Sequence, residues 1–117
     1  MKKYIKVNDN PAKVTHLRIE LYYNLGGFNC FTYKEEPRGY YISVTPVERA
    51  NMSGYSTETV TAFSGIKQCV KQVTRKSAKA EAEAEKLAVD VMDNLVDYVC
   101  KKNGLNLQNL EANLCTN

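Results

Sequence analysis

The apolar residues of this chain change their spacing near residue 64, and that change limits the folds open to it. Between Val14 and Tyr23, apolar side chains alternate with polar ones, which is the period of a strand with one buried face. From Ile66 onward, apolar residues recur every three or four positions, which is the period of an amphipathic helix. Strands in one half and helices in the other predict an α+β fold, in which C-terminal helices pack on an N-terminal antiparallel β-sheet.

The first half is expected to form about four strands. Besides the strand at 14–23, we expect strands at 28–34, 40–46 and 55–63, with turns at 24–27 and 35–39 and a loop at 48–54. The strands at 14–23 and 28–34 are expected to pair as a hairpin. A further short strand at 1–7 is compatible with the sequence, before a turn at 8–11.

The second half is expected to form a short helix followed by a longer one. The apolar residues of 66–73 recur at helical spacing, and Ser64 lies where an N-cap belongs. A longer helix is expected from about Ala78 to Lys101, and Gly104 is a suitable residue to end it. Ser77 could cap this helix, so we expect the chain to bend over 74–77, although nothing in these residues forbids one long continuous helix.

At 117 residues, the chain has the length of one compact domain. We expect a single domain over 1–117, with the sheet in 1–63, the helices in 64–104 and a docking tail in 105–117. Leu105, Leu107, Leu110 and Leu114 make this tail too apolar to stay free, so it is expected to dock on the core or on another subunit. No apolar stretch is long enough to span a bilayer, and Met1–Val7 lacks the apolar run of a signal peptide, so we expect the protein to act in a cytosol.

The formal net charge of +3 is unevenly distributed along the chain. Residues 1–63 carry a net +2, residues 64–80 a net +5 and residues 81–117 a net −4. A short basic segment beside an acidic one can form a local anion site, whereas a nonspecific nucleic-acid binder usually has a broad basic surface. The distribution favours a small anionic ligand over long DNA, although solvated helix faces with i,i+4 pairs also account for it.

Catalysis and metal binding find little support in the sequence. His16 is the only histidine and lies on the polar side of an expected strand, so a serine or cysteine nucleophile has no evident base. The four cysteines are at least fifteen residues apart, which argues against a zinc site. No phosphate-transfer or dinucleotide-binding motif occurs. We therefore expect a binding protein with no catalytic residue, no metal site and no cofactor.

The candidate ligand-binding residues combine aromatic rings with cations. A base stacked on an aromatic ring gains about 1–3 kcal/mol, and an arginine can stack on a ring or grip a phosphate. The expected helix start at 64–67 offers backbone N–H groups and a lysine to a phosphate. Cross-strand packing is nevertheless the commoner use of a tyrosine in a strand. The candidate set is Asn24, Phe28, Asn29, Arg38, Tyr40, Tyr41, Ser64, Lys67 and Arg75.

Two other classes of function remain open at this point. The run from Arg75 to Ala80, followed by an alanine-rich helix, resembles the last helix of a double-stranded-RNA-binding domain, in which lysines grip phosphates. The expected helix at 66–73 and the lack of a helix before the strands argue against that family. A purely structural oligomer is the third class.

Taken together, several segments resemble the first anti-Thoeris family, phage proteins that sequester the cyclic ADP-ribose signal made by bacterial TIR enzymes. These segments are Gly26-Gly27-Phe28-Asn29, Phe31-Thr32, 38–47 and 61–65, within a resemblance over 14–103. The resemblance implies an N-terminal antiparallel sheet with C-terminal helices, a dimer or larger homo-oligomer, and a ligand held without chemistry at the subunit interface. We expect the protein to act in the cytoplasm of the bacterial host, without a membrane partner and with a small nucleotide in preference to a nucleic acid.

Overall fold

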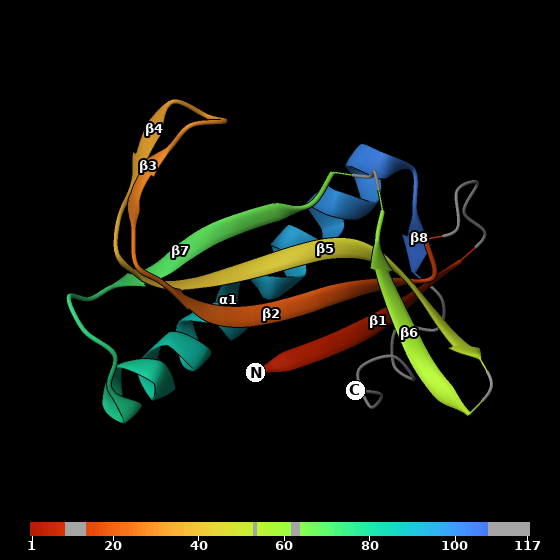
Figure 1. Cartoon of the computed structure of the whole chain (residues 1–117), viewed down its shortest axis with the longest axis horizontal. Coiled ribbons are helices and arrows are strands. Elements are labelled where there is room, and N and C mark those ends of the chain that lie inside the picture. The colour runs from red at the N-terminus through yellow and green to blue at the C-terminus, as the bar shows by residue number, and fades with distance from the viewer. Residues whose placement is uncertain (9–13, 53, 62–63, 108–117) are drawn as a thin grey trace.

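An antiparallel sheet backed by one long helix makes up the part of the chain that the structure describes. This computed structural model describes residues 1–8, 14–52, 54–61 and 64–107. Figure 1 shows most of the strands in one layer, with the helix lying across one face and a short two-stranded ribbon projecting from one end. In chain order the elements are β1 (Lys2–Asn8), β2 (His16–Asn24), β3 (Gly27–Asn29), β4 (Lys34–Glu36), β5 (Gly39–Met52), β6 (Tyr55–Val60), β7 (Ile66–Gln72), α1 (Ala78–Asn103) and β8 (Asn106–Leu107).

The main sheet is organised around β5, its longest strand. The strand order is β6-β5-β2-β1-β8, and β7 also pairs with β5. Along one edge, residues 39–47 of β5 pair with β2. Along the other edge, β7 pairs with residues 39–44 and β6 with residues 47–52, so these two strands follow one another. All of these pairings are antiparallel, which confirms the α+β fold expected from the sequence.

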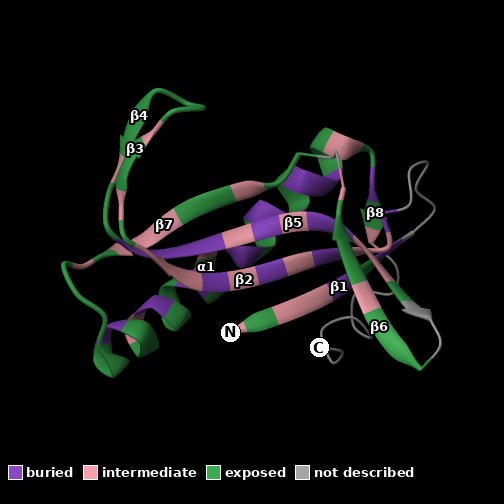
Figure 2. Ribbon diagram, viewed as in Figure 1, coloured by how far each residue is buried: buried purple, intermediate pink, exposed green. Residues whose placement is uncertain are grey.

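The core lies between the sheet and α1, and the alternation of the strands determines which side chains enter it. In β2, Leu17 and Ile19 are fully buried while Arg18 lies on the opposite face of the sheet. On α1, small residues at i,i+4 spacing let the helix approach the sheet closely. Figure 2 shows the resulting buried band along β2 and β5. The helix contributes Ala80, Ala84, Ala88, Met92, Leu95, Val96, Val99 and Cys100 to the core.

Both ends of α1 are capped as the sequence predicts. The Ser77 hydroxyl accepts a hydrogen bond from the backbone N–H of Ala80 at 3.1 Å, and Ser77 itself is extended. Gly104 ends the helix with a left-handed φ of 66°, and its N–H donates to the Cys100 carbonyl. The bend expected over 74–77 is confirmed, because α1 begins only at Ala78. Within the described residues, no helix is long and apolar enough to cross a membrane.

The short helix predicted for 66–73 is wrong, because this segment is strand β7. A bulge explains the misleading spacing. Cys69 pairs with Tyr41 and Lys71 with Tyr40, so Val70 is an extra residue that shifts the alternation by one. As a result, Ile66, Val70 and Val73 all pack against the core, although their spacing is that of a helix. The segment forms a strand because it can hydrogen-bond to an edge of β5, whereas so short a helix is only marginally stable alone.

The hairpin predicted between 14–23 and 28–34 is also wrong. β2 pairs with β5, and the intervening residues form a separate two-stranded ribbon of β3 and β4. An Asx turn ends β3, because the Asn29 side-chain oxygen accepts hydrogen bonds from the N–H groups of Phe31 and Thr32. The predicted loop at 48–54 is largely strand, since β5 continues through Pro46 to Met52.

The chain ends of the described part both join the sheet. The short strand suggested for 1–7 is confirmed as β1, which pairs with β2. Leu105 is buried and β8 pairs with β1, so the beginning of the tail docks on the core as predicted. Leu110 and Leu114 lie outside the described residues, as do Phe63 of the predicted fourth strand and most of the predicted turn at 8–11.

We expect Ser77→Ala to lower the free energy of unfolding by about 1 kcal/mol, because the mutant loses the hydrogen bond to the Ala80 N–H. Chemical denaturation monitored by circular dichroism measures this loss. Ser77→Asp retains an acceptor at the cap and should remain within about 0.5 kcal/mol of the wild type. Equal stability of Ser77→Ala and the wild type would contradict the capping role.

Candidate functional site

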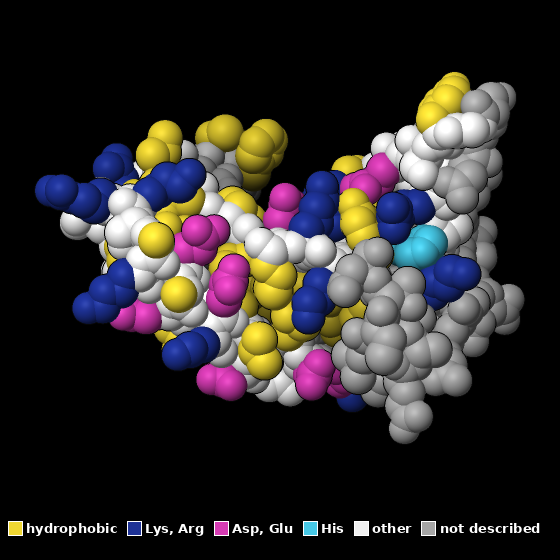
Figure 3. Space-filling view, turned by 90° about the horizontal axis from the view of Figure 1, so that it is seen from below, with side chains coloured by type: hydrophobic (Ala, Val, Ile, Leu, Met, Phe, Trp, Pro, Cys, Tyr) yellow, Lys and Arg dark blue, Asp and Glu magenta, His cyan; other side chains and the backbone are white. Residues whose placement is uncertain are grey.

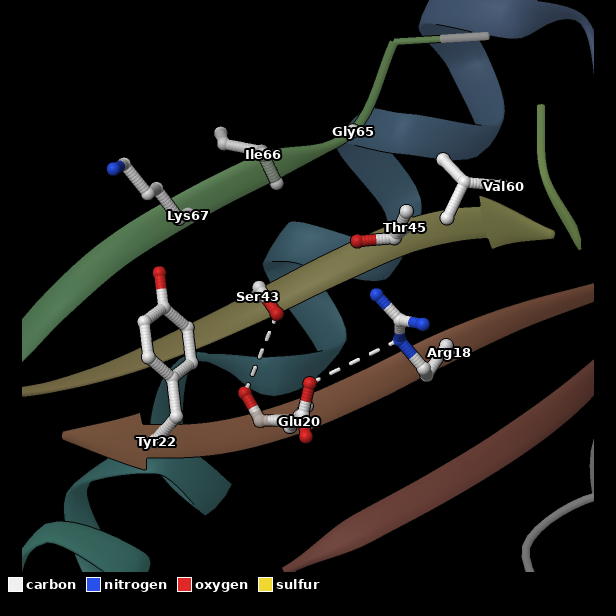
Figure 4. Close-up of a pocket in the computed structure, with 9 residues that line it drawn as sticks. All are labelled: Arg18, Glu20, Tyr22, Ser43, Thr45, Val60, Gly65, Ile66 and Lys67. Carbon is white, nitrogen blue, oxygen red and sulfur yellow. Dashed lines mark hydrogen bonds and ion pairs between the residues drawn. The ribbon is translucent and has the colours of Figure 1, made fainter. Parts of the chain in front are cut away.

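The face of the sheet that α1 leaves uncovered carries a groove of about 510 Å³. We call it the sheet groove. Figure 4 shows that its floor comes from β2 and β5, and that β7 and the preceding residues form one side. The groove is lined by Arg18, Glu20, Tyr22, Ser43, Thr45, Val60, Gly65, Ile66 and Lys67.

The strand register arranges this lining in rungs across the sheet. Arg18 pairs with Thr45 in the first rung, and Glu20 pairs with Ser43, which in turn pairs with Lys67, in the second. The spacing of residues along a strand and of strands across a sheet places the Cα atoms of Arg18 and Lys67 about 12 Å apart. A cation therefore lies at each of two opposite corners of the groove.

The groove is hollow because its central residues are small. Ser43 and Thr45 form the floor, and Gly65 lies at the side, where β7 approaches β5. A Cβ atom built at Gly65 lies only 2.6 Å from the Val44 carbonyl oxygen, so any larger residue must push the two segments apart. The close approach at Gly65 thus fixes this wall of the groove.

Arg18 is held by two carboxylates. Its guanidinium forms an ion pair with Glu58 of β6, and its Nε lies 3.9 Å from the Glu20 carboxylate. That distance is too long for a hydrogen bond, and within the described residues the buried Nε has no acceptor. Burial alone raises the pKa of Glu58, but hydrogen bonds from the Tyr4 hydroxyl and from Arg18 outweigh it and lower the pKa. Glu58 is therefore ionised at neutral pH.

Lys67 is held in a similar way at the opposite corner. Its Nζ lies 2.7 Å from the Glu36 carboxylate of β4 and 5.8 Å from the centre of the Tyr41 ring. Glu36 also accepts hydrogen bonds from the side chains of Asn24 and Asn29. The hydrogen bond from Lys67, followed by that from Asn29, lowers the pKa of Glu36.

One end of the sheet groove is closed by a stacked pair of tyrosines. The Tyr22 and Tyr41 rings lie 6.0 Å apart with an interplanar angle of 26°. Tyr41, the cross-strand neighbour of Tyr22, is buried; its hydroxyl donates to the Pro37 carbonyl, and burial raises its pKa to about 12, with a contribution from Cys69. Tyr22 is half-buried and lines the groove, so it is the ring of this pair that can contact a ligand.

The aromatic residues of the candidate set lie in different surroundings. Tyr40 is buried in the core, and its hydroxyl donates to the Ser77 carbonyl at 3.4 Å. Tyr41 is buried beside Tyr22, and Phe28 is 60% exposed on the β3–β4 ribbon. Phe28 and Tyr33 contact each other edge to face. The structure therefore does not bring Phe28, Tyr40 and Tyr41 together as one stacking surface.

The polar residues of the set divide between the ribbon and the loop before α1. Asn24 and Asn29 bind Glu36, and Arg38 donates from Nε to the Leu25 carbonyl at 2.9 Å and from a terminal nitrogen to the Thr74 carbonyl. Arg75 is exposed in that loop. Of the candidate set, Lys67 lines the sheet groove, with Asn24 and Asn29 reaching its partner Glu36.

Ser64 does not have the role that the sequence predicted. It precedes a strand instead of capping a helix, and its backbone N–H and carbonyl bond to the side chain of Asn103 at the end of α1. The phosphate site expected from helix N–H groups at 64–67 is therefore wrong, whereas Lys67 still faces the groove.

Sequence reasoning missed most of the groove lining. Arg18, Glu20 and Tyr22 alternate with buried residues in β2, and Ser43 and Thr45 do the same in β5. This alternation identified the polar face of each strand. It could not show that the polar faces of β2 and β5 lie side by side in one sheet, or that α1 covers the opposite face. Their shared register with Lys67 could have been found only by pairing β5 with both β2 and β7.

Comparison with known proteins finds no matching family model, no significantly similar curated protein and no significantly similar solved structure.

Within the described residues, no group of histidine, cysteine, aspartate and glutamate side chains is arranged to hold a metal ion.

We expect Gly65→Ala to lower the free energy of unfolding by about 1–3 kcal/mol, because its Cβ meets the Val44 carbonyl oxygen. Urea denaturation measures the change. Ser64→Ala is the matched control, since the hydrogen bonds of Ser64 to Asn103 use its backbone. The control should stay within about 0.5 kcal/mol of the wild type. If the two variants are equally stable, β7 does not approach β5 as described.

Proposed function

We propose that this protein is a sponge for a small phosphate-bearing nucleotide of the cyclic ADP-ribose type, which it holds in the sheet groove without cleaving it. The observation that carries the proposal is the groove itself, with Arg18 and Lys67 at opposite corners and Tyr22 at one end. Cations and an aromatic ring are the groups that recognise a phosphate and a base. The resemblance to the anti-Thoeris family supplies the ligand class and the bacterial host cytoplasm as the place of action.

The dimensions of the groove fit a ligand of this kind. Its volume of about 510 Å³ lies within the range of small-molecule sites. The uncharged floor of Ser43 and Thr45 offers hydroxyl groups to ribose or base edges, between the two cations. A nucleotide can thus place its phosphates near the cations and its base against Tyr22.

The groups around the groove favour binding over catalysis. His16 lies outside the lining, where its Nδ1 is 2.8 Å from the Thr15 hydroxyl and its ring meets Tyr4 edge to face. Burial and the neighbouring Arg49 lower the pKa of His16. Glu20 is the carboxylate in the lining, and it faces the Arg18 guanidinium. The Ser43 hydroxyl, across the strand pair from Glu20, donates to the Glu20 backbone carbonyl at 3.5 Å and not to its carboxylate, so these two residues are not joined as nucleophile and base.

A lysine variant tests the proposed site. We expect Lys67→Met to weaken binding of a cyclic ADP-ribose isomer about ten- to a hundredfold, the scale of a lost charge-assisted hydrogen bond. Lys71→Met is the matched control, because Lys71 pairs with Glu83 of α1 and should leave the affinity unchanged. Isothermal titration calorimetry gives both affinities, and mass spectrometry of the denatured complex should return the nucleotide intact. Equal weakening by both variants, or release of ADP-ribose, would exclude a non-catalytic site at Lys67.

Binding of double-stranded RNA is a second candidate, favoured by one observation. No helix lies between β7 and α1 to argue against this class, and Arg75 and Lys76 are exposed in the loop before α1, with Lys79 exposed in its first turn. Strands β1 and β2 still precede β5, in place of the first helix of that family. This candidate predicts salt-sensitive binding of duplex RNA that is lost in Lys76→Ala and kept in Lys67→Met.

We also propose that the protein is a homo-oligomer, a dimer or larger. The β3–β4 ribbon exposes a group of large apolar side chains, of which Phe31 is 90% exposed and Tyr33 80%. Exposed apolar groups of this kind are usually covered in an assembly. Light scattering at micromolar concentration should give at least twice the chain mass of 13.2 kDa. A monodisperse 13.2 kDa species would contradict the oligomer.

A further inference from the structure

The two cations of the sheet groove are each neutralised by a carboxylate from a projecting part of the molecule. Lys67 is bound by Glu36 of the β3–β4 ribbon, and Arg18 by Glu58 of β6. Neither carboxylate lines the groove. Figure 3 shows the face in profile, hollowed between two raised ends. An anionic ligand in the groove must therefore compete with both carboxylates, and it also lies near the Glu20 carboxylate, which lines the groove 3.9 Å from the Arg18 Nε.

The β3–β4 ribbon is attached to the body mainly through polar contacts near its base. Its large side chains Phe28, Phe31 and Tyr33 are all at least 60% exposed, so they do not pack on the sheet. Glu36 binds Lys67 of β7, and Arg38, just after the ribbon, binds the Leu25 and Thr74 carbonyls. The Glu36–Lys67 pair is thus a principal link between the ribbon and the sheet.

Contacts of Glu58 hold β6 against the face of the sheet that carries the groove. This residue reaches past β5 to the Tyr4 hydroxyl on β1 and to Arg18 on β2. Apart from its pairing with residues 47–52 of β5, β6 is largely exposed, with Val60 59% and Tyr55 62% exposed. The Glu58 contacts therefore hold β6 toward the groove at the corner occupied by Arg18.

We propose that Glu36 and Glu58 are built-in competitors for the anion site, and that a ligand with at least two negative charges displaces both carboxylates when it takes Lys67 and Arg18. The ribbon and β6 then lose these links to the sheet, while β6 stays paired with β5. This inference rests on the proposed function and adds both a specificity and a regulation to it. A monoanion can replace only one carboxylate, whereas a pyrophosphate can compensate both cations. Because binding and release are thermodynamically linked, loosening either link must also strengthen anion binding.

The test uses inorganic pyrophosphate as the probe and three charge-removing variants of the full chain. Glu36→Gln and Glu58→Gln each weaken one link, and Glu35→Gln, next to Glu36 on β4 and exposed, is the matched control. Without ligand, hydrogen exchange should become faster in residues 27–36 of Glu36→Gln and in residues 55–60 of Glu58→Gln. Pyrophosphate should bind these two variants about three- to tenfold more tightly than the wild type, and Glu35→Gln should match the wild type.

The outcomes separate this inference from the proposed function. Weaker or unchanged pyrophosphate binding by Glu36→Gln and Glu58→Gln overturns the inference, whatever the exchange rates show. Acetate, which carries one negative charge, serves as the comparison, and a larger gain for acetate than for pyrophosphate also overturns the inference. If the pyrophosphate results hold but no variant binds cyclic ADP-ribose isomers, the competition is supported and the proposed nucleotide is wrong.

Discussion

The double-edged pairing of β5 is the constraint on which the rest of the structure depends. Residues 39–44 of β5 hydrogen-bond to β2 on one edge and to β7 on the other, so their side chains must alternate between the helix and the open face. Ile42 and Val44 then enter the core under α1, while Ser43 and Thr45 form the floor of the sheet groove. Core and groove are thus two sides of the same strand, and neither can change register alone.

The positions of the charges in the groove depend on the pairing of the strands as much as on the residues that carry the charges. Arg18 and Lys67 are 49 positions apart in the chain, and the pairing of β2, β5 and β7 brings them to one face. In isolation, both would attract anions, but Glu36 and Glu58 already neutralise them. Any ligand must therefore exchange one set of ion pairs for another, which makes selectivity depend on the competing carboxylates.

Local sequence signals predicted the elements whose stability is largely local. Ser77 and Gly104 mark the ends of α1, and the alternation of β2 shows in its residues without reference to a partner. The same local signals failed for β7, where a bulge at Val70 gave a strand the spacing of a helix. They failed again at β3 and β4, because which strand pairs with β2 depends on distant residues of β5.

The candidate site, like the fold, could be predicted from the sequence only in part. The sequence by itself determined which residue types are available: a basic segment around Lys67, tyrosines in β2 and β5, and polar residues on alternate positions of each strand. Only the tertiary structure decided that Tyr40 and Tyr41 are buried, that Lys67 lies on a strand and that Arg18 shares its groove. The physical reason is that alternation fixes the two faces of each strand locally, whereas the pairing of strands and the face that α1 covers are settled by contacts between residues far apart in the chain.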